Sequence, residues 1–245
     1  MRGREREKMT NRKFGKAIAA IFFTSLLVTS SSFPEASGAQ EPNSIREGLP
    51  GRRIGSGTRG ECNFGQKQLT ALIPKNNLAL TVAANPQLFF YLPSISNSQI
   101  IEFVLLDEAD NQIYEKTFKP TSTNGIISLS LSDASLKELA ISKKYHWYLS
   151  IICNAQDRAN DISVDGWIQR VELNPTLAKK LEQTAPLQRP TVYATADLWQ
   201  DALANLAQLR LSHPNDTKIA SEWSQLLRSI DLNNIAQEPV VALSF

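Results

Sequence analysis

Between residues 68 and 173 the sequence breaks into short runs of β-branched and aromatic residues, with polar turn residues between the runs. Strands are expected at residues 69–73, 78–82, 88–92, 100–106, 112–118, 126–131, 145–153 and 164–173. Residues 107–111 form a polar turn, and no helix-length crossover separates most neighbouring runs, so adjacent strands should be antiparallel. The spacing predicts an immunoglobulin-like antiparallel β-sandwich over residues 62–173.

The apolar pattern changes to helical spacing after residue 173. Asn174 is suited to be a helix N-cap and Pro175 to be the first helical residue. Further helices are expected over residues 198–211 and 216–229, where apolar residues recur at three-to-four spacing. Pro190 precedes the first of these helices, and Pro214 separates the two. The fold class is therefore α+β, with helical hairpins over residues 174–237 and a tail over residues 238–245.

One part of the helical region resembles a known repeat. Tyr193, Ala202, Leu206, Leu209 and Pro214 have the spacing of a single tetratricopeptide repeat. No second full repeat follows, although such repeats stabilise one another by stacking. The expected structure is a degenerate tetratricopeptide-like hairpin rather than an array.

The N-terminus has the pattern of an export signal over residues 1–39, with a basic stretch, an apolar core from Ala17 to Val28 and a cleavage site at Ala39. The apolar core has about a dozen residues, whereas a membrane span needs roughly twenty. Cleavage and release into the periplasm or the extracellular space are expected, and an uncleaved signal anchor is the alternative. Residues 40–61 are rich in glycine and arginine, which predicts a flexible linker.

Loss of the signal also changes the charge of the protein. It removes seven of 26 basic and three of 24 acidic residues, which leaves a net charge of about −2. The basic surface of a nucleic-acid-binding protein is therefore missing, and no nucleic-acid partner is expected.

The two cysteines, Cys62 and Cys153, are expected to form a disulfide because an exported chain with an even number of cysteines usually pairs them. Two buried free thiols are the alternative. Trp147 has the same strand parity as Cys153 and is expected to point into the sandwich. A sugar-stacking role for Trp147 is the less favoured interpretation.

The span from Cys62 to about Gln237 resembles a cyanobacterial family of unknown function, DUF928. The resemblance rests on residues 59–62, 69–74, 102–107, 147–153, 157–158, 166–171 and 199–203. It implies an exported cyanobacterial protein of uncharacterised role. It provides no catalytic residue.

The loop over residues 154–161 carries the densest set of polar side chains. Asp157, Arg158 and Asp161 could bind a partner or fix the loop through an ion pair. With Asn160 and Asp165, the loop also has oxygen ligands of the kind that Ca²⁺ prefers, but not the spacing of an EF-hand. An ion pair that fixes the loop is the favoured interpretation.

Other chemistry has little support in the sequence. His146 and His213 lie in unrelated contexts, no zinc, phosphate-binding or nucleophile motif is present, and no metal or cofactor is expected. A carboxylate pair for glycoside cleavage would need Asp107 or Glu108 to face an acid of the 157–165 loop.

These observations favour a non-enzymatic exported module that binds an unknown envelope or secreted protein or has a structural role. The contact candidates in the helical region are Tyr193, Trp199 and Trp223, and the alternative is that they form the core between the helices and the sandwich. The second hypothesis is a carbohydrate-binding or glycoside-cleaving envelope protein. It requires an exposed aromatic platform, and it would be weakened if the following residues were all in the core: Phe89, Phe90, Tyr91, Trp147 and Trp167.

Overall fold

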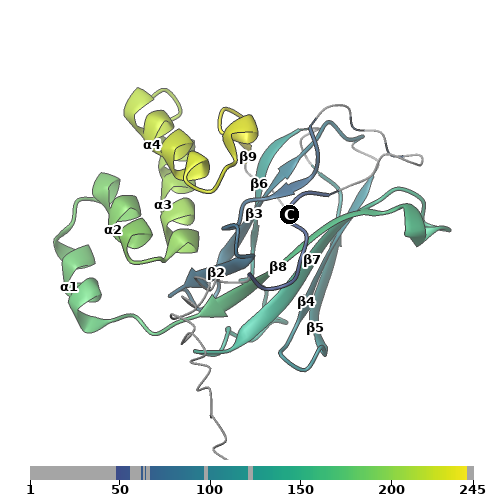
Figure 1. Cartoon of the computed structure of the whole chain (residues 1–245), viewed down its shortest axis with the longest axis horizontal. Helices are drawn as coiled ribbons and strands as arrows, with labels where there is room; N and C mark the ends of the chain where they lie inside the picture. Colours follow the sequence, from purple (N-terminus) through teal and green to yellow (C-terminus); the bar gives the residue numbers. More distant parts are fainter. Residues whose placement is uncertain are drawn as a thin grey trace, which may run out of the picture. The chain divides into compact units, whose positions relative to one another are not determined.

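Two β-sheets lie face to face, and helices α3 and α4 pack on the outer side of one of them (Figure 1). The computed structural model describes residues 48–55, 62, 64, 67–96, 99–120 and 124–241. All of them belong to one compact unit that extends from Ser44 to Phe245. The export signal predicted for residues 1–39 lies outside the described residues.

The smaller sheet has four strands in the order β1-β3-β6-β9. Its strands are β1 (Thr70–Ala71), β3 (Gln87–Leu92), β6 (Gly125–Ser130) and β9 (Val240–Val241). The larger sheet has five strands in the order β2-β8-β7-β4-β5. Its strands are β2 (Leu78–Thr81), β8 (Ile162–Arg170), β7 (Lys144–Ile152), β4 (Ile100–Leu106) and β5 (Gln112–Phe118).

The helical segments follow β8. They are α1 (Pro175–Gln183), α2 (Arg189–Thr195), α3 (Trp199–Ser212) and α4 (Thr217–Arg228), with short 3₁₀ turns η1 (Arg158–Asn160), η2 (Pro186–Gln188) and η3 (Asn233–Ile235). Asn174 caps α1 by accepting a hydrogen bond from the Thr176 backbone N–H at 2.8 Å. The eight strands and the helices expected from the sequence are present. The strand expected over residues 69–73 is shortened to Thr70–Ala71, and the one expected over residues 164–173 runs from Ile162 to Arg170.

The inner faces of the two sheets form the first core. Phe90 of β3 meets Trp147 of β7 edge to face, with ring centroids 5.3 Å apart. Leu149 and Ile151 share the parity of Trp147 and are fully buried, so the expected orientation of this strand is confirmed. Cys62 and Cys153 form the expected disulfide at the edge of this core. Closure of a 91-residue separation stabilises the fold by roughly 4 kcal/mol in the chain-entropy model.

The second core lies between the four-stranded sheet and the helices. Phe89 and Tyr91 of β3 point to this side and pack in one cluster with Leu203, Trp223 and Leu227 of α3 and α4. The apolar stripe predicted for α4 therefore has its docking surface, which is the outer face of the smaller sheet.

Two strand pairs correct the expectation of a purely antiparallel fold. Strand β2 runs parallel to β8, and β9 runs parallel to β6. A tight turn after β1, closed by a hydrogen bond from Asn77 N–H to the Pro74 carbonyl, takes the chain into the other sheet, where β2 lies beside β8. Strand β9 also shows that the expected tail, residues 238–245, contributes a strand to the smaller sheet.

Candidate functional site

Residues 48–55, here called the N-terminal strap, lie in the segment that was expected to be a flexible linker. The strap is instead fixed to the sheets by its backbone: Leu49 N–H donates to the Asn76 carbonyl at 2.9 Å, and Gly55 N–H donates to the Leu69 carbonyl at 2.8 Å. The side chain of Arg53 donates to the carbonyl of Ile230, two residues after the end of α4, at 2.8 Å. The strap therefore joins the sheets to the helical layer, which corrects the linker prediction for these residues.

The strap contacts β8 through Asp165. The Arg52 N–H donates to the Asp165 carboxylate at 2.8 Å, and the Asp165 N–H donates to the Arg52 carbonyl at 2.9 Å. The Pro50 carbonyl accepts from the Trp167 indole at 2.9 Å and from the Asn77 side chain at 3.0 Å. Only glycine fits between these contacts, because Gly51 has a φ of +152° and an added Cβ would lie 1.7 Å from Asn77 Nδ2.

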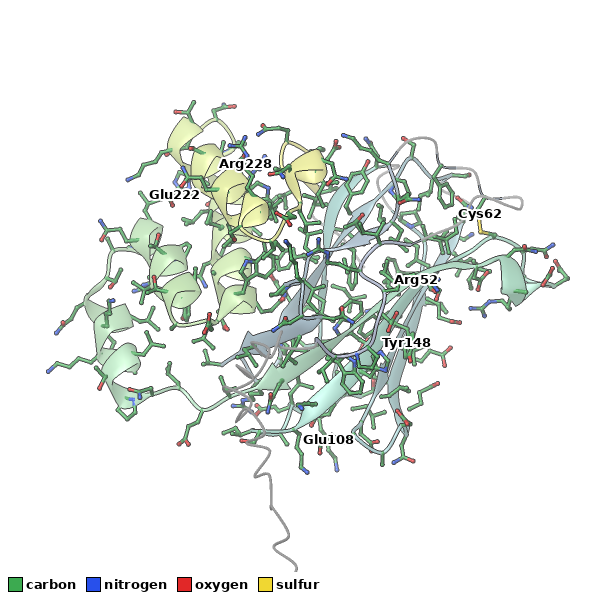
Figure 2. The ribbon with its side chains drawn as sticks, viewed as in Figure 1. Arg52, Cys62, Glu108, Tyr148, Glu222 and Arg228 are labelled. Atoms are coloured by element: carbon green, nitrogen blue, oxygen red, sulfur yellow. A yellow bond between two sulfur atoms is a disulfide. The ribbon has the colours of Figure 1, made fainter. Side chains whose placement is uncertain are left out.

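Four side chains next to the strap form what is here called the outer-face cluster: His146, Tyr148, Asp165 and Trp167. His146 Nε2 lies 2.9 Å from an Asp165 oxygen, and the Tyr148 hydroxyl lies 3.0 Å from His146 Nδ1. In the neutral imidazole this arrangement requires Nε2–H to donate to Asp165 and Nδ1 to accept from Tyr148. Burial raises the pKa of Tyr148, and the nearby Asp165 charge raises it further. Figure 2 shows Tyr148 and Arg52 over the same part of the five-stranded sheet.

The rings of this cluster pack against one another. The imidazole of His146 stacks on Trp167, with centroids 4.2 Å apart and planes 7° apart, and Tyr148 tilts against the same imidazole at 4.4 Å. Of the five aromatic residues whose exposure tests the carbohydrate hypothesis, Trp167 alone is not in the core. The stack occupies one face of its ring, so Trp167 and Tyr148 form a compact cluster rather than a flat open platform.

The 154–161 loop is fixed by its own side chains. Arg158 donates to Glu102 of β4 at 2.7 Å and also forms an ion pair with Asp161. Asp157 caps η1 by accepting from Ala159 N–H at 3.1 Å, and Asp161 accepts from Cys153 N–H at 3.2 Å. The favoured interpretation of an internal ion pair therefore has direct geometric support, and the loop is held beside the disulfide.

Among the carboxylates considered for glycoside cleavage, Glu108 lies at the opposite end of β7 from Asp157 and Asp161. Glu108 binds Lys143 at 2.9 Å, next to the first residue of β7, whereas Asp157 and Asp161 follow the last residue of that strand. A nine-residue strand spans roughly 30 Å. Glycosidase carboxyl pairs are separated by about 5 to 9.5 Å. Glu108 is therefore too far from Asp157 and Asp161 to form such a pair with them. Asp165 lies within β8, where its carboxylate is bound by the Arg52 N–H and lies 2.9 Å from His146 Nε2.

The three contact candidates of the helical region lie at different depths. Trp223 is fully buried, Trp199 is 8% exposed, and Tyr193 on α2 is half-buried. The alternative interpretation, in which the two tryptophans form the core between helices and sheet, matches their positions. They offer no exposed face to a partner.

Asp201 is a buried carboxylate that the sequence analysis missed. It lies in the first turn of α3, where it accepts hydrogen bonds from Thr81 Oγ1 at 3.2 Å and from Val82 N–H at 3.1 Å. Burial raises its pKa to about 6, although these hydrogen bonds act in the opposite direction. The group fixes α3 on the end of β2, and no sequence motif marks it.

Residues of α2, α3 and α4 line a groove in the helical layer, with a cavity of about 210 Å³. Leu206 of α3 lies at its base, between Pro190 and Ala194 of α2 and Leu226 of α4. Glu222, labelled in Figure 2 on α4, lines the same groove. The groove can accept one apolar side chain.

Two further classes of site are not seen in the part of the chain that the structure describes. No group of three His, Cys, Asp or Glu side chains is placed to hold a metal ion there. None of the helices in the same residues is long and apolar enough to cross a membrane.

Residues 54–240 match the family model described as Domain of Unknown Function (DUF928). The chain belongs to the DUF928 family. The match in this DUF928 protein runs from the strap to β9, and no curated protein matches the chain. One similar solved structure is titled "Solution structures of the fn3 domain of human collagen alpha-1(XX) chain". It is 9% identical, has a TM-score of 0.27, and covers 49% of this chain and 90% of its own.

Proposed function

We propose that this DUF928 protein is a non-enzymatic exported module that binds another envelope or secreted protein through the groove between α2 and α4. The observation that carries the proposal is the groove itself, because three helices supply an apolar base and a polar rim of the kind that accepts a protein side chain. The helices α2 to α4 would then be the degenerate tetratricopeptide-like hairpins. The cyanobacterial origin implied by the family resemblance is part of the same proposal.

The same proposal assigns the two sheets to the immunoglobulin-like class. The order β1-β3-β6 opposite β8-β7-β4-β5 corresponds to strands A-B-E opposite G-F-C-C′ of that fold. In this assignment β2 is a second part of the first strand, which has changed sheets. The sandwich acts as the support that holds the helical layer.

Export is supported by the disulfide, because such bonds persist mainly in oxidising compartments. The test is expression of the full chain in a bacterial host, followed by fractionation and alkylation of free thiols. We expect oxidised cysteines outside the cytoplasm, and reduced, cytoplasmic protein for Leu26→Arg. Ser44→Arg, outside the apolar core, should behave like wild type. Oxidised wild-type protein that stays in the cytoplasm would refute export.

The groove is tested by a photo-crosslinking amino acid placed at Ala194 or Leu226 and, as the control, at the exposed Thr117 of β5. We expect one protein to be captured from the groove positions and not from Thr117. The captured protein is then purified and its affinity is measured for wild type and Leu226→Glu. Equal affinity for the two, or equal capture at Thr117, would refute the groove as the binding site.

The second candidate is a carbohydrate-binding protein. The observation for it is Trp167, which lies half-buried on the outer face rather than in the core, with Tyr148 close by in the same cluster. Affinity electrophoresis in gels containing envelope polysaccharide tests it with Trp167→Ala and Tyr148→Ala. Retardation of wild type that both variants lose would support this candidate. Unchanged mobility in every gel would remove it.

A further inference from the structure

A cavity of about 500 Å³ opens at one end of the five-stranded sheet, next to the turn between β4 and β5. Its wall is formed by that turn, by β5, by the segment between β6 and β7, and by the start of β7. Figure 2 marks this end of the sheet with Glu108. The volume is within the range of small-molecule sites, which is about 300 to 1,000 Å³.

A β-bulge places an apolar side chain in this wall. Leu105 pairs with Tyr114 and Leu106 pairs with Gln112, so Ile113 has no partner on β4. Bulges near sheet edges change the direction in which a side chain points. Ile113 lines the cavity and is 38% exposed, and Leu136 and Ala140 add further apolar surface.

Tyr145 supplies a buried hydrogen-bond donor at the same place. It is 9% exposed, and its hydroxyl accepts the Ala140 N–H at 3.0 Å. No group among the described residues accepts the proton of that hydroxyl. A buried donor without an acceptor costs free energy, and a ligand oxygen in the cavity would remove that cost.

The charges around the cavity leave one cation for a ligand. The Asp107 carboxylate is held by Asn111 and by the Ala109 N–H, and Glu138 faces Arg170 at 3.4 Å. Lys137 lines the cavity and forms no ion pair with any residue that the structure describes. Ser135, which also lines the cavity, donates its hydroxyl to Asp133 at 2.7 Å. The donors left free among the lining side chains are therefore the Tyr145 hydroxyl and the Lys137 ammonium.

We propose that this cavity binds a small apolar molecule that carries a carboxylate, with the apolar body against Ile113 and Leu136. The carboxylate accepts from Tyr145 and pairs with Lys137. The site is separate from the helical groove and from the outer-face cluster, and it does not depend on the protein-binding proposal.

The test compares two probes with the same apolar body, 4-butylbenzoate and 4-butylbenzylamine, by saturation-transfer NMR and by chemical-shift mapping on the full mature protein. We expect the carboxylate to bind with shifts at Ile113 and Leu136, and the amine to bind at least tenfold more weakly. Equal affinity for the two probes, or no binding of 4-butylbenzoate at millimolar concentration, would overturn the proposal.

Variants locate the binding site. Ile113→Trp fills the cavity from a partly exposed position and should abolish binding of 4-butylbenzoate, whereas Leu211→Trp, at a 48% exposed position on α3, should leave it unchanged. Tyr145→Phe should weaken binding about tenfold, because hydrogen bonds to charged groups are among the stronger ones. Lys137→Gln should reduce the preference for the carboxylate, and Lys179→Gln on α1 is its control.

Tyr145→Phe also removes the acceptor of the Ala140 N–H and could disturb the backbone there. Ile113→Trp leaves this hydrogen bond in place, so it tests the cavity independently of Tyr145. Near-UV circular dichroism confirms that each variant is folded. Unchanged binding in a folded Ile113→Trp variant would place the ligand elsewhere and overturn the proposal.

Discussion

The outer faces of the two sheets are covered in different ways. On the four-stranded sheet, Phe89 and Tyr91 are buried under α3 and α4 by apolar contacts, among them those of Trp223. On the five-stranded sheet, the outer-face cluster is held by hydrogen bonds to the strap and by ring stacking. Apolar burial stabilises the first face in proportion to the area that is buried, and it follows the periodicity of the sequence. Each polar contact on the second face depends on the positions of one donor atom and one acceptor atom. The two faces should therefore respond differently to substitution.

The largest effect is expected for Trp223→Ala in the apolar layer. Trp223 is fully buried, and its removal should lower the free energy of unfolding by about 3 to 5 kcal/mol through lost burial and a cavity. Urea denaturation of the protein measures this change. Leu211→Ala, 48% exposed on the neighbouring helix, should stay within about 0.5 kcal/mol of wild type. Similar losses for the two variants would mean that the helical layer does not depend on this core.

The next effect concerns Asp201, a buried carboxylate of α3. Its pKa is about 6 in the folded protein and near 3.8 in the unfolded chain, so the folded state holds the proton more tightly. Its contribution to stability is full below pH 4 and is lost as the pH rises through 6. Two pKa units correspond to a loss on the order of 3 kcal/mol.

The measurement is urea unfolding of wild type and Asp201→Asn from pH 4 to pH 7.5. Subtraction of the two curves removes the contribution of the other carboxylates. The variant should gain stability relative to wild type as the pH rises through 6. Tyr193 is the titratable neighbour of this group and stays protonated over the range, since burial and Asp201 raise its pKa. A difference that does not change with pH would contradict the proposed burial of the charge.

Sequence patterns predicted the parts of the fold that repeat. Strands and helices follow alternation and three-to-four spacing, and Trp147 was placed inward by parity alone. The strap could not be predicted in this way, because residues 48–55 have no periodic apolar pattern and one of their contacts, Asp165, lies more than a hundred residues away in the sequence.

The candidate sites also divide into those that local sequence predicts and those that long-range contacts form. The Arg158–Asp161 pair was predictable because both groups lie in one short loop. The cavity beside Ile113 was not, because it is formed by a bulge and by three segments whose distance in space the sequence does not give. Long-range pairing decides such sites, and local propensity does not.

A smaller effect is expected for the strap. In Gly51→Val, the new side chain would overlap Asn77 and force the strap away from β8, at a cost of about 1 to 3 kcal/mol. Limited trypsin digestion should then cleave faster after Arg52 and Arg53, whose backbone bonds protect them in wild type. Ser163→Val, on the same strand as Asp165, should digest at the wild-type rate. Slow digestion of Gly51→Val would show that the strap is held without this glycine.

The smallest effect is expected for Tyr148→Phe in the outer-face cluster. The change removes only the hydroxyl that donates to His146 Nδ1, and a hydrogen bond of this kind contributes about 0.5 to 1.5 kcal/mol. The decisive measurement is the imidazole nitrogen spectrum of His146. In wild type the proton should reside on Nε2, facing Asp165, whereas in the variant Nδ1 loses its donor and the tautomers should begin to mix. An unchanged spectrum would mean that the hydrogen bond to Asp165 alone fixes the imidazole and that the Tyr148 hydroxyl adds little to the outer-face cluster.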